Sequence, residues 1–345
     1  MKTGQVRQNV QSPTRRTVLR TAGGMVGAGV AAPFIGRLSP ALAAYPDRPI
    51  KLLVPFGPGG PVDVIARIVG AQLGEALGGA SVVVENRAGA SGNLGVGLAA
   101  RADPDGYTVL FTSSTFVINP MLFTNVPYDP IADFTPLVDL ASSPTAFAVT
   151  PQLGVNTLAE FVALAKKDGS KLSYGSAGFG TPAHLAGEFL KNRAGIDMAH
   201  VPFNGAAPAT QALLSGAIQF VSFALPGVHP HVKGGTMKGL AVTGEKRWFD
   251  LPEVPTMVEV GYPGFVLDTF TAMLLPAKTP PEIADRLSKA VLTVLGPPEI
   301  RAKLRTVGFE VNAGGSDALK AKIARELPLW RDIAKIAGIK PTESK

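Results

Sequence analysis

The segment that most constrains the fold is a strand, a glycine-rich turn and a helix in direct succession, at residues 50–69. It opens with a nearly continuous apolar run from Ile50 to Phe56, which is typical of a strand buried on both faces. The Gly and Pro residues that follow allow neither a strand nor a helix to continue. Beyond Pro61, apolar residues recur at helical spacing, so we expect a helix to begin there.

A glycine-rich turn before a helix lets a ligand approach the first N–H groups of that helix, which have no partner within it. These groups lie at the positive end of the helix dipole, so the segment predicts a site for a phosphate, sulfate or carboxylate. It is not a Walker loop, because Pro61 follows Gly60 where a Lys is required. It is not a dinucleotide fingerprint either, because Val62 replaces the third glycine. An ordinary tight turn explains the same residues equally well.

The first 43 residues have the pattern of a cleaved export signal. Arg15 and Arg16 form a twin-arginine motif, a mildly apolar stretch rich in Gly and Ala follows, and a small-x-small cleavage site ends at Ala43. A general secretory signal that contains two arginines is the alternative. Either signal places a mature chain that starts at Ala44 outside the cytoplasm, in the periplasm. A membrane anchor is disfavoured because the apolar stretch is short and broken by glycines.

Charge and composition exclude several classes of function. The signal holds six of the 33 basic residues and none of the 26 acidic ones, so the mature chain has a net charge of only +1. This balance gives no reason to expect binding to nucleic acid or to a membrane surface. The chain has no cysteine and four histidines without ligand spacing, so no metal site and no cofactor are expected.

Alternating strands and helices over a mature length of about 300 residues predict an α/β protein of two domains. Glycine-rich or polar turns follow several of the predicted strands, at residues 86–92, 113–120, 175–181 and 202–208. Ligands of α/β proteins usually bind at such strand ends. Further along, Phe147–Thr150 is predicted as a strand. The tail is predicted as an amphipathic helix, interrupted at Pro328, with Trp330 buried.

Several long motifs carry a resemblance to a known family. YPDRPIKLLVPFGPGGPVDVIAR, ENRAGASGNLG, YGSAGFGTPAHLAGE, VPFNGAAPATQALLSGAIQ and LPEVPTMVEVGYPGF occur in this order along the mature chain. In these motifs the sequence resembles the Bug/TctC solute-binding proteins, which are the extracytoplasmic receptors of tripartite tricarboxylate transporters.

The resemblance implies a two-lobed periplasmic binding protein of the type II kind, each lobe a mainly parallel sheet flanked by helices. Two segments cross between the lobes, and we place them near Ala141–Pro144 and Pro263–Asp268. Lobe 1 then comprises residues 44–142 plus 266–345, and lobe 2 comprises residues 143–265.

The resemblance also implies a small carboxylate held between the lobes, mainly by backbone N–H groups, hydroxyls and ordered water. The matching positions in lobe 1 lie on two loops, and they are Phe56, Gly59, Gly60, Val62, Asp63, Ser113, Ser114, Phe116 and Asn119. In lobe 2 they are Ser176, Gly178, Gly180, Thr181, His184, Phe203, Asn204 and Ala206.

Some positions depart from the family pattern and bear on the ligand. Val62 stands where Thr or Ser is common, Phe116 where a polar residue is frequent, and Asn204 where Lys or Arg is often seen. With Phe179 and Phe203 near the proposed cleft, these changes suggest a monocarboxylate or an aromatic acid rather than citrate. Simple packing of the phenylalanines is an equally good explanation.

Two charged or polar positions have ordinary alternatives. Asp63 suits a ligand amine or hydroxyl, but an acid in the first turn of a helix more often stabilises the helix dipole. His184 suits a carboxylate, but a lone histidine in a first turn is more often a surface residue.

Other functions are weighed against the receptor. A serine hydrolase would use Ser176 with His184, but Tyr174 breaks the G-x-S-x-G pattern and no acid is marked as a partner for the histidine, so we expect no enzyme. A sensing protein that presents its closed form to a signalling receptor is the nearer alternative. The expected partners are the carboxylate and the membrane subunits of a tripartite tricarboxylate transporter, and the protein is expected to be a monomer.

Overall fold

The computed structural model describes residues 45–343. The export signal predicted for residues 1–43, with its twin-arginine motif and cleavage site, lies outside this range. Within it, strands and helices alternate along most of the chain, so the predicted α/β class is confirmed.

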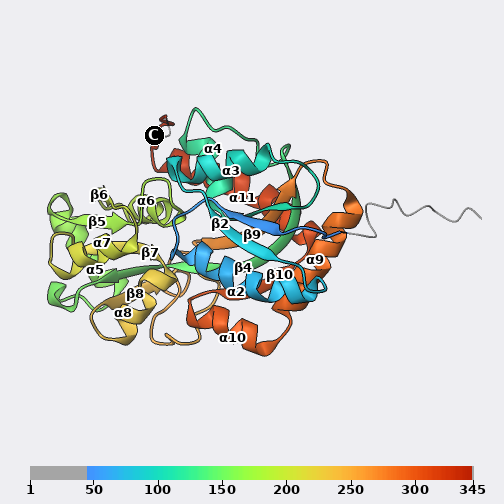
Figure 1. Ribbon diagram of the computed structural model, residues 1–345. Helices are drawn as coiled ribbons and strands as arrows, with labels where there is room; N and C mark the ends of the chain where they lie inside the picture. The colour runs from blue at the N-terminus through green and yellow to red at the C-terminus, as the bar shows by residue number, and fades with distance from the viewer. Residues whose placement is uncertain (1–44, 344–345) are drawn as a thin grey trace, which may run out of the picture. The chain divides into compact units, whose positions relative to one another are not determined.

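Ten strands of the described residues join in one mixed sheet (Figure 1). The path runs β2-β1-β3-β9-β4-β7-β5-β6, and β10 and β8 also pair with β4. Segments far apart in the sequence therefore lie side by side, as β3 and β9 do near the middle of the sheet. The strands are β1 (Ile50–Val54), β2 (Val82–Asn86), β3 (Thr108–Ser113), β4 (Phe134–Val149), β5 (Ser173–Ser176), β6 (Ala199–Pro202), β7 (Phe220–Ala224), β8 (Lys238–Val242), β9 (Asp268–Pro276) and β10 (Glu310–Gly314).

Strand β4 links the two parts of the sheet because it changes neighbours part-way along. Its residues from Phe134 to Pro144 pair with β9, whereas those from Thr145 to Val149 pair with β7. On one side of this change β2, β1 and β3 are parallel, and on the other side β6, β5 and β7 are parallel. Each part is therefore a parallel group bordered by antiparallel strands.

The change of neighbours falls next to the first predicted crossing, Ala141–Pro144. Strand β9 begins at Asp268, where the second predicted crossing ends. The sequence indicated only the last part of β4 as a strand, at Phe147–Thr150. Its earlier part contains Pro136, Ser142, Ser143 and Pro144, which hide the strand pattern, and pairing with β9 stabilises it there.

The division into lobes at residues 44–142 plus 266–345 and 143–265 stays a prediction. Contacts group the described residues, 45–343, as one unit. One buried cluster also contains residues of both predicted lobes, among them Leu110 and Phe147. The hydrophobic core therefore runs across the change of partners in β4.

Helix α2 begins at the predicted residue, and two other helices begin after a threonine that suits an N-cap. Pro61 is the first residue of α2 with Gly60 as its N-cap, and Thr157 caps α5. Thr181 caps α6 by accepting a hydrogen bond from the backbone N–H of His184. The helices are α2 (Pro61–Ala76), α3 (Asn93–Ala100), α4 (Thr115–Leu122), α5 (Leu158–Asp168), α6 (Pro182–Ala194), α7 (Ala206–Leu214), α8 (His229–Lys233), α9 (Pro281–Leu295), α10 (Pro298–Thr306) and α11 (Ser316–Ile336).

The predicted interruption of the last helix at Pro328 is wrong, because α11 is continuous through it. A proline removes one backbone hydrogen bond and crowds the preceding turn, which usually bends or ends a helix. Here buried side chains lie on both sides of the proline, with Ile323 before it and Trp330 and Ile333 after it. Their packing on both sides of the proline stabilises α11 as one continuous helix.

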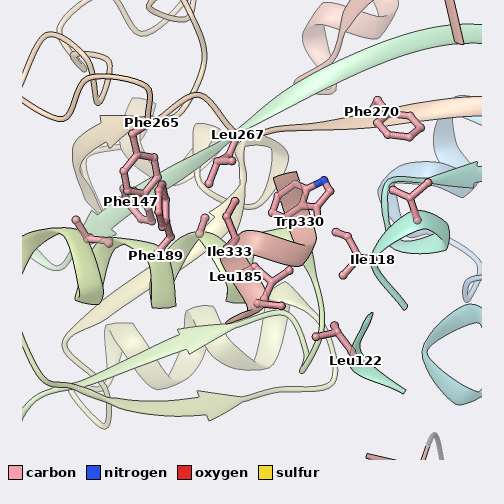
Figure 2. Close-up of a cluster of buried hydrophobic side chains, with 14 of the residues drawn as sticks. Ile118, Leu122, Phe147, Leu185, Phe189, Phe265, Leu267, Phe270, Trp330 and Ile333 are labelled. Carbon is pink, nitrogen blue, oxygen red and sulfur yellow. The ribbon is translucent and has the colours of Figure 1, made fainter. Parts of the chain in front are cut away.

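Helix α11 packs its apolar face against elements from the middle of the chain. Figure 2 shows Trp330 and Ile333 of α11 close to Leu185 of α6, with Ile118 and Leu122 of α4 nearby. The Trp330 side chain is fully buried, as the sequence predicts, and its Nε1–H donates to the Glu326 carboxylate. The tail of the chain therefore holds together segments that precede it by more than a hundred positions.

We expect Trp330→Ala to lower the free energy of unfolding by about 3–5 kcal/mol, because it leaves a large cavity in this cluster. Urea unfolding followed by circular dichroism measures the change. Lys320→Ala, at an exposed position of the same helix, is the matched control and should change stability by less than about 0.5 kcal/mol. A loss below 1 kcal/mol in Trp330→Ala would contradict the central role given to this side chain.

Candidate functional site

The first predicted loop ends in a helix terminus with no side-chain cap. Gly60 is the N-cap of α2 and Pro61 its first residue, so the N–H groups of Val62 and Asp63 have no partner within the helix. The Val62 side chain is buried in the core under the helix. This position therefore offers its backbone N–H to a ligand and not its side chain.

The Asp63 side chain holds this loop in place and is not free to meet a ligand. Its carboxylate accepts hydrogen bonds from Gly59 N–H at 2.8 Å, from Arg67 at 2.9 Å and from Asn86 Nδ2 at 2.9 Å. Asn86 Nδ2 also donates to the Phe56 carbonyl at 3.0 Å. Burial alone would raise the pKa of Asp63, but the bonds from Arg67, Gly59 and Asn86 outweigh it and lower the pKa. A charged Asp63 therefore fixes both ends of the glycine turn.

The polar groups of the second predicted loop are mostly used within the protein. Ser114 Oγ accepts a hydrogen bond from Phe270 N–H at 2.8 Å, which ties α4 to β9. Asn119 Nδ2 donates to the Ser91 carbonyl at 3.0 Å and to Asn93 Oδ1 at 2.7 Å. It thereby orders the second glycine-rich turn, where Ser91 and its neighbour Ala90 both have positive φ. Ser113 Oγ lies 3.1 Å from Thr115 Oγ1.

Phe116 lies in the core and not on an accessible surface. Its side chain is 1% exposed and meets the rings of Phe134 and Phe270 edge-on, at centroid distances of 6.3 and 6.2 Å. Among the predicted aromatic residues, Phe203 is half-buried and Phe179 is 38% exposed. The aromatic character expected of the site therefore rests on these two rings and on Phe56.

In the third predicted loop, Ser176 pairs with a histidine that the sequence did not indicate. Ser176 Oγ lies 2.8 Å from His200 Nε2 and 3.0 Å from the Gly178 carbonyl. His184, the expected partner, instead accepts a hydrogen bond from Gly180 N–H through Nδ1 at 3.1 Å. The two imidazoles stack with centroids 4.0 Å apart. His184 is buried, so the expectation of an ordinary surface histidine is wrong.

Burial keeps both histidines of the stack neutral. Burial, with the charges of His200 and Lys191, lowers the pKa of His184 to about 3. Burial and the charge of Lys191 lower the pKa of His200 to about 4. The stack continues to Tyr174 on one side and Phe179 on the other. Neutral, stacked rings of this kind shape the loop and do not supply positive charge to an anion.

The remaining predicted positions follow β6. Phe203 N–H donates to the Ser176 carbonyl at 3.1 Å, and Gly205 N–H donates to the Ala177 carbonyl at 3.1 Å. These bonds hold the two loops of this part of the chain together. Asn204 between them is exposed, and Ala206 begins α7.

Close contacts in space connect the loops to one another and to the turn at Gly92. A side chain on Gly92 would lie 3.3 Å from the Phe56 ring, which places the second glycine turn beside the first. A side chain on Gly180 would lie 2.8 Å from Leu122 at the end of α4. The rings of Phe123 and Phe179 are 6.4 Å apart at the same place. The loop that follows β5 is therefore a neighbour of the C-terminal end of α4.

Sequence reasoning missed the residues that hydrogen-bond to the predicted site residues and hold them in place. Arg67 follows Asp63 by four positions, a spacing typical of an ion pair on one helix face, and would have been found by that rule. Asn86 and Asn93 carry no such signal. His200 sits on an edge strand and meets Ser176 only through the pairing of β5 with β6.

Within residues 45–343, no group of acidic or histidine side chains is arranged to hold a metal ion. No helix of this range has the length and apolar composition needed to cross a bilayer.

The fold and the loops at its strand ends define a two-lobed α/β binding protein. The periplasmic binding protein BugD shares 33% sequence identity with the chain, with a TM-score of 0.78 over 86% of this chain and all of BugD. An R. palustris protein solved with adipate is 34% identical, with a TM-score of 0.80 over 86% of this chain and 99% of its own. MatC from Rhodopseudomonas palustris, solved with bound malate, is 30% identical, with a TM-score of 0.75 over 84% and 99%.

The family follows from a match that spans most of the chain. Residues 65–339 match the model of the tripartite tricarboxylate transporter family receptor, TctC. The chain belongs to this family, and the predicted resemblance is confirmed.

The neutral histidine pair predicts a pH dependence of stability. In the unfolded chain these histidines have a pKa of about 6.5. In the folded protein the pKa is about 3 for His184 and about 4 for His200. The free energy of unfolding therefore falls as the pH drops from 6.5 towards 4. In His200→Gln, whose amide can still bond Ser176, this slope should be shallower by up to about 1.4 kcal/mol per pH unit. Urea unfolding between pH 4.5 and 7.5 measures it, and an unchanged slope would contradict the assignment.

Proposed function

We propose that the protein is a periplasmic receptor that captures a small carboxylate and delivers it to a tripartite tricarboxylate-type transporter. The observation that carries this proposal is the uncapped N-terminus of α2, whose glycine turn is fixed by Asp63. Free N–H groups at a helix N-terminus bind carboxylates because they donate hydrogen bonds at the positive end of the dipole. The turn is held in position before any ligand arrives, which reduces the entropic cost of binding.

Membership of the family supports the chemical class of the ligand. Two relatives were solved with dicarboxylates, adipate in one case and malate in the other. In this chain, Arg67 is paired with Asp63 and the histidine stack is neutral. A carboxylate would therefore be held by N–H groups and hydroxyls, as the resemblance implied.

The predicted site residues divide into two roles under this proposal. Those with accessible groups would contact the ligand, namely Phe56, Gly60, Val62 through its N–H, Phe203, Asn204 and Ala206. Those whose groups are engaged within the protein would position the loops, namely Gly59, Asp63, Ser113, Ser114, Asn119, Ser176, Gly178, Gly180, Thr181 and His184. Phe116 would act only through the core.

The expected preference for a monocarboxylate or an aromatic acid over citrate loses part of its support. It rested in part on three phenylalanines, and one of them, Phe116, is part of the core. The Phe203 ring packs towards Gly175, where a side chain would come within 3.2 Å of it. Phe179 alone of the three is well exposed.

Partner, location and oligomeric state follow the family under this proposal. The receptor acts as a monomer in the periplasm, and its closed form docks on the membrane subunits of the transporter. Signalling through a sensor receptor would use the same closure.

We propose no enzymatic activity. Ser176 has a histidine partner, but the pKa of His200 is lowered by burial, which makes it a poor general base at neutral pH. Its ring is stacked between His184 and Tyr174. No carboxylate of the described residues hydrogen-bonds to it, so the orienting acid of a hydrolase triad is lacking.

A thermal-shift screen tests the ligand class. The mature protein from Ala44, unfolded and refolded to remove co-purified ligand, is heated with mono-, di- and tricarboxylates, amino acids, phosphate and sugars. A specific ligand at a hundred times its Kd stabilises the fold by about 2.7 kcal/mol, which gives a clear shift in Tm. We expect shifts with one or a few carboxylates only. A response to sugars or cations with none to carboxylates would overturn the proposal.

Substitution of Gly60 tests the position of the carboxylate. Its φ of −72° and ψ of 163° suit any residue, and an added Cβ would lie 3.4 Å from the Gly57 carbonyl. Gly60→Asp puts a carboxylate on the free N–H groups of α2, so it should stabilise the fold by roughly 0.3 kcal/mol, the small difference between Asp and Gly as N-caps. Because it competes with the ligand, affinity should fall by about a hundredfold or more.

Gly60→Ala is the matched control, because it changes the backbone in the same way but supplies no cap. It should bind the ligand within a few-fold of the unmodified protein. If calorimetry shows equal affinities for Gly60→Asp and Gly60→Ala, the ligand carboxylate does not bind at α2.

A further inference from the structure

A row of hydroxyl side chains lies on one face of the central strands, where β3, β9 and β4 meet. Ser113 pairs directly with Thr271, which pairs on its other side with Ala141. Ser143 pairs with Thr269 in the same way. Directly paired residues share a face of a sheet, as do residues two apart along a strand. The hydroxyl row therefore comprises Ser113, Thr269, Thr271, Ser143 and Thr145.

Three members of the hydroxyl row are buried without a hydrogen-bond partner. The side chains of Thr271, Ser143 and Thr145 are 0% exposed, and none of their Oγ atoms is bonded. Ser113 Oγ meets only Thr115 Oγ1. Buried hydroxyls nearly always have hydrogen-bond partners, because an unpaired one has lost its hydrogen bonds to water and gained none within the protein. Three such groups in one row point to a polar group that they are built to bind.

The hydroxyl row begins beside the proposed carboxylate site. Ser113 is the last residue of β3, and β3 pairs in parallel with β1, whose end leads into the glycine turn before α2. At its other end Thr145 pairs with Ala224, the last residue of β7. A molecule whose carboxylate lies at the N-terminus of α2 would extend along this row.

The opposite face of the same strands is different in character. It carries Phe270 and Ala272, which belong to the cluster under α11. Lys322 of α11 lies on that side, 5.4 Å from the Phe270 ring centroid. The hydroxyl row itself contains no charged side chain. A second carboxylate there would be buried without a counter-charge, which is costly, whereas a neutral hydroxyl can both donate to and accept from Thr and Ser.

We propose that Thr271 and Ser143 form a subsite that hydrogen-bonds a hydroxyl substituent of the ligand, so that the receptor selects hydroxy acids. This inference deepens the proposed function and rests on it. The two residues determine specificity and are separate from the N–H groups that hold the carboxylate. They come from the crossing strands, which none of the sequence-predicted positions occupies.

Matched acids that differ by one hydroxyl test the subsite. The pairs are malate with succinate, lactate with propionate, and mandelate with phenylacetate, each titrated calorimetrically into the refolded mature protein. We expect the hydroxylated member of at least one pair to bind about tenfold tighter or more, because a site built for a hydroxyl rejects the analogue that lacks it. In Thr271→Val and Ser143→Ala this preference should fall at least tenfold, while affinity for the other member stays within about twofold.

Thr112→Val is the control, since it makes the same chemical change on the other face. Thr112 is also 0% exposed with an unpaired hydroxyl, but it pairs with Ala272 and precedes Ser113, so it points away from the hydroxyl row. The Thr112→Val protein should prefer the hydroxylated acid as strongly as the unmodified protein does. Thr271→Ser, which keeps the hydroxyl, should retain most of the preference and serves if Thr271→Val does not fold.

Each outcome has one meaning. Loss of the preference in Thr271→Val but not in Thr112→Val supports the subsite. Three results overturn the subsite and leave the receptor function intact. They are an unchanged preference in both Thr271→Val and Ser143→Ala, an equal loss of preference in Thr112→Val, and no preference in the unmodified protein. Failure of every acid to bind overturns the proposed function itself, and the subsite with it.

Discussion

The pairing of β4 with β9 is the constraint on which the rest of the structure depends. Because β4 exchanges β9 for β7 after Pro144, one strand carries hydrogen bonds to both parts of the sheet. The register at this point sets Ser143 opposite Thr269 and Thr271 beside Ser113. A slip of one residue would turn these hydroxyls to the other face and bring Phe270 in their place. The floor of the proposed ligand site is thus a consequence of backbone pairing.

Around this floor, charged and polar side chains mostly hold loops in position. Asp63 fixes the first glycine turn, Asn119 the second, and the pair of Ser176 with His200 the third. Each of these side chains limits the flexibility of a glycine turn by a hydrogen bond to a specific backbone or side-chain group. The groups left for a ligand are backbone N–H groups and neutral hydroxyls, which would recognise a carboxylate through geometry more than through net charge.

Local sequence was enough for the elements and for the first loop. The strand from Ile50 and the helix from Pro61 follow from residue type and spacing, and they form as predicted. The α/β class and the family follow as well, because the motifs are long and keep their order. By contrast, Pro136 and Pro144 conceal the long strand β4, and Pro328 suggested a break that packing of Trp330 and Ile333 prevents.

The amino-acid sequence alone determines which segments become strands, turns and helices, because those choices rest on neighbours within a few positions. It also indicates an anion site, since a glycine turn and a helix start are adjacent in the chain. Tertiary structure assigns the partners: His200 and not His184 to Ser176, the core and not the site to Phe116, and one shared face to Ser143 and Thr271. These contacts join residues far apart in sequence, and their register depends on the pairing of whole strands, which no local pattern encodes.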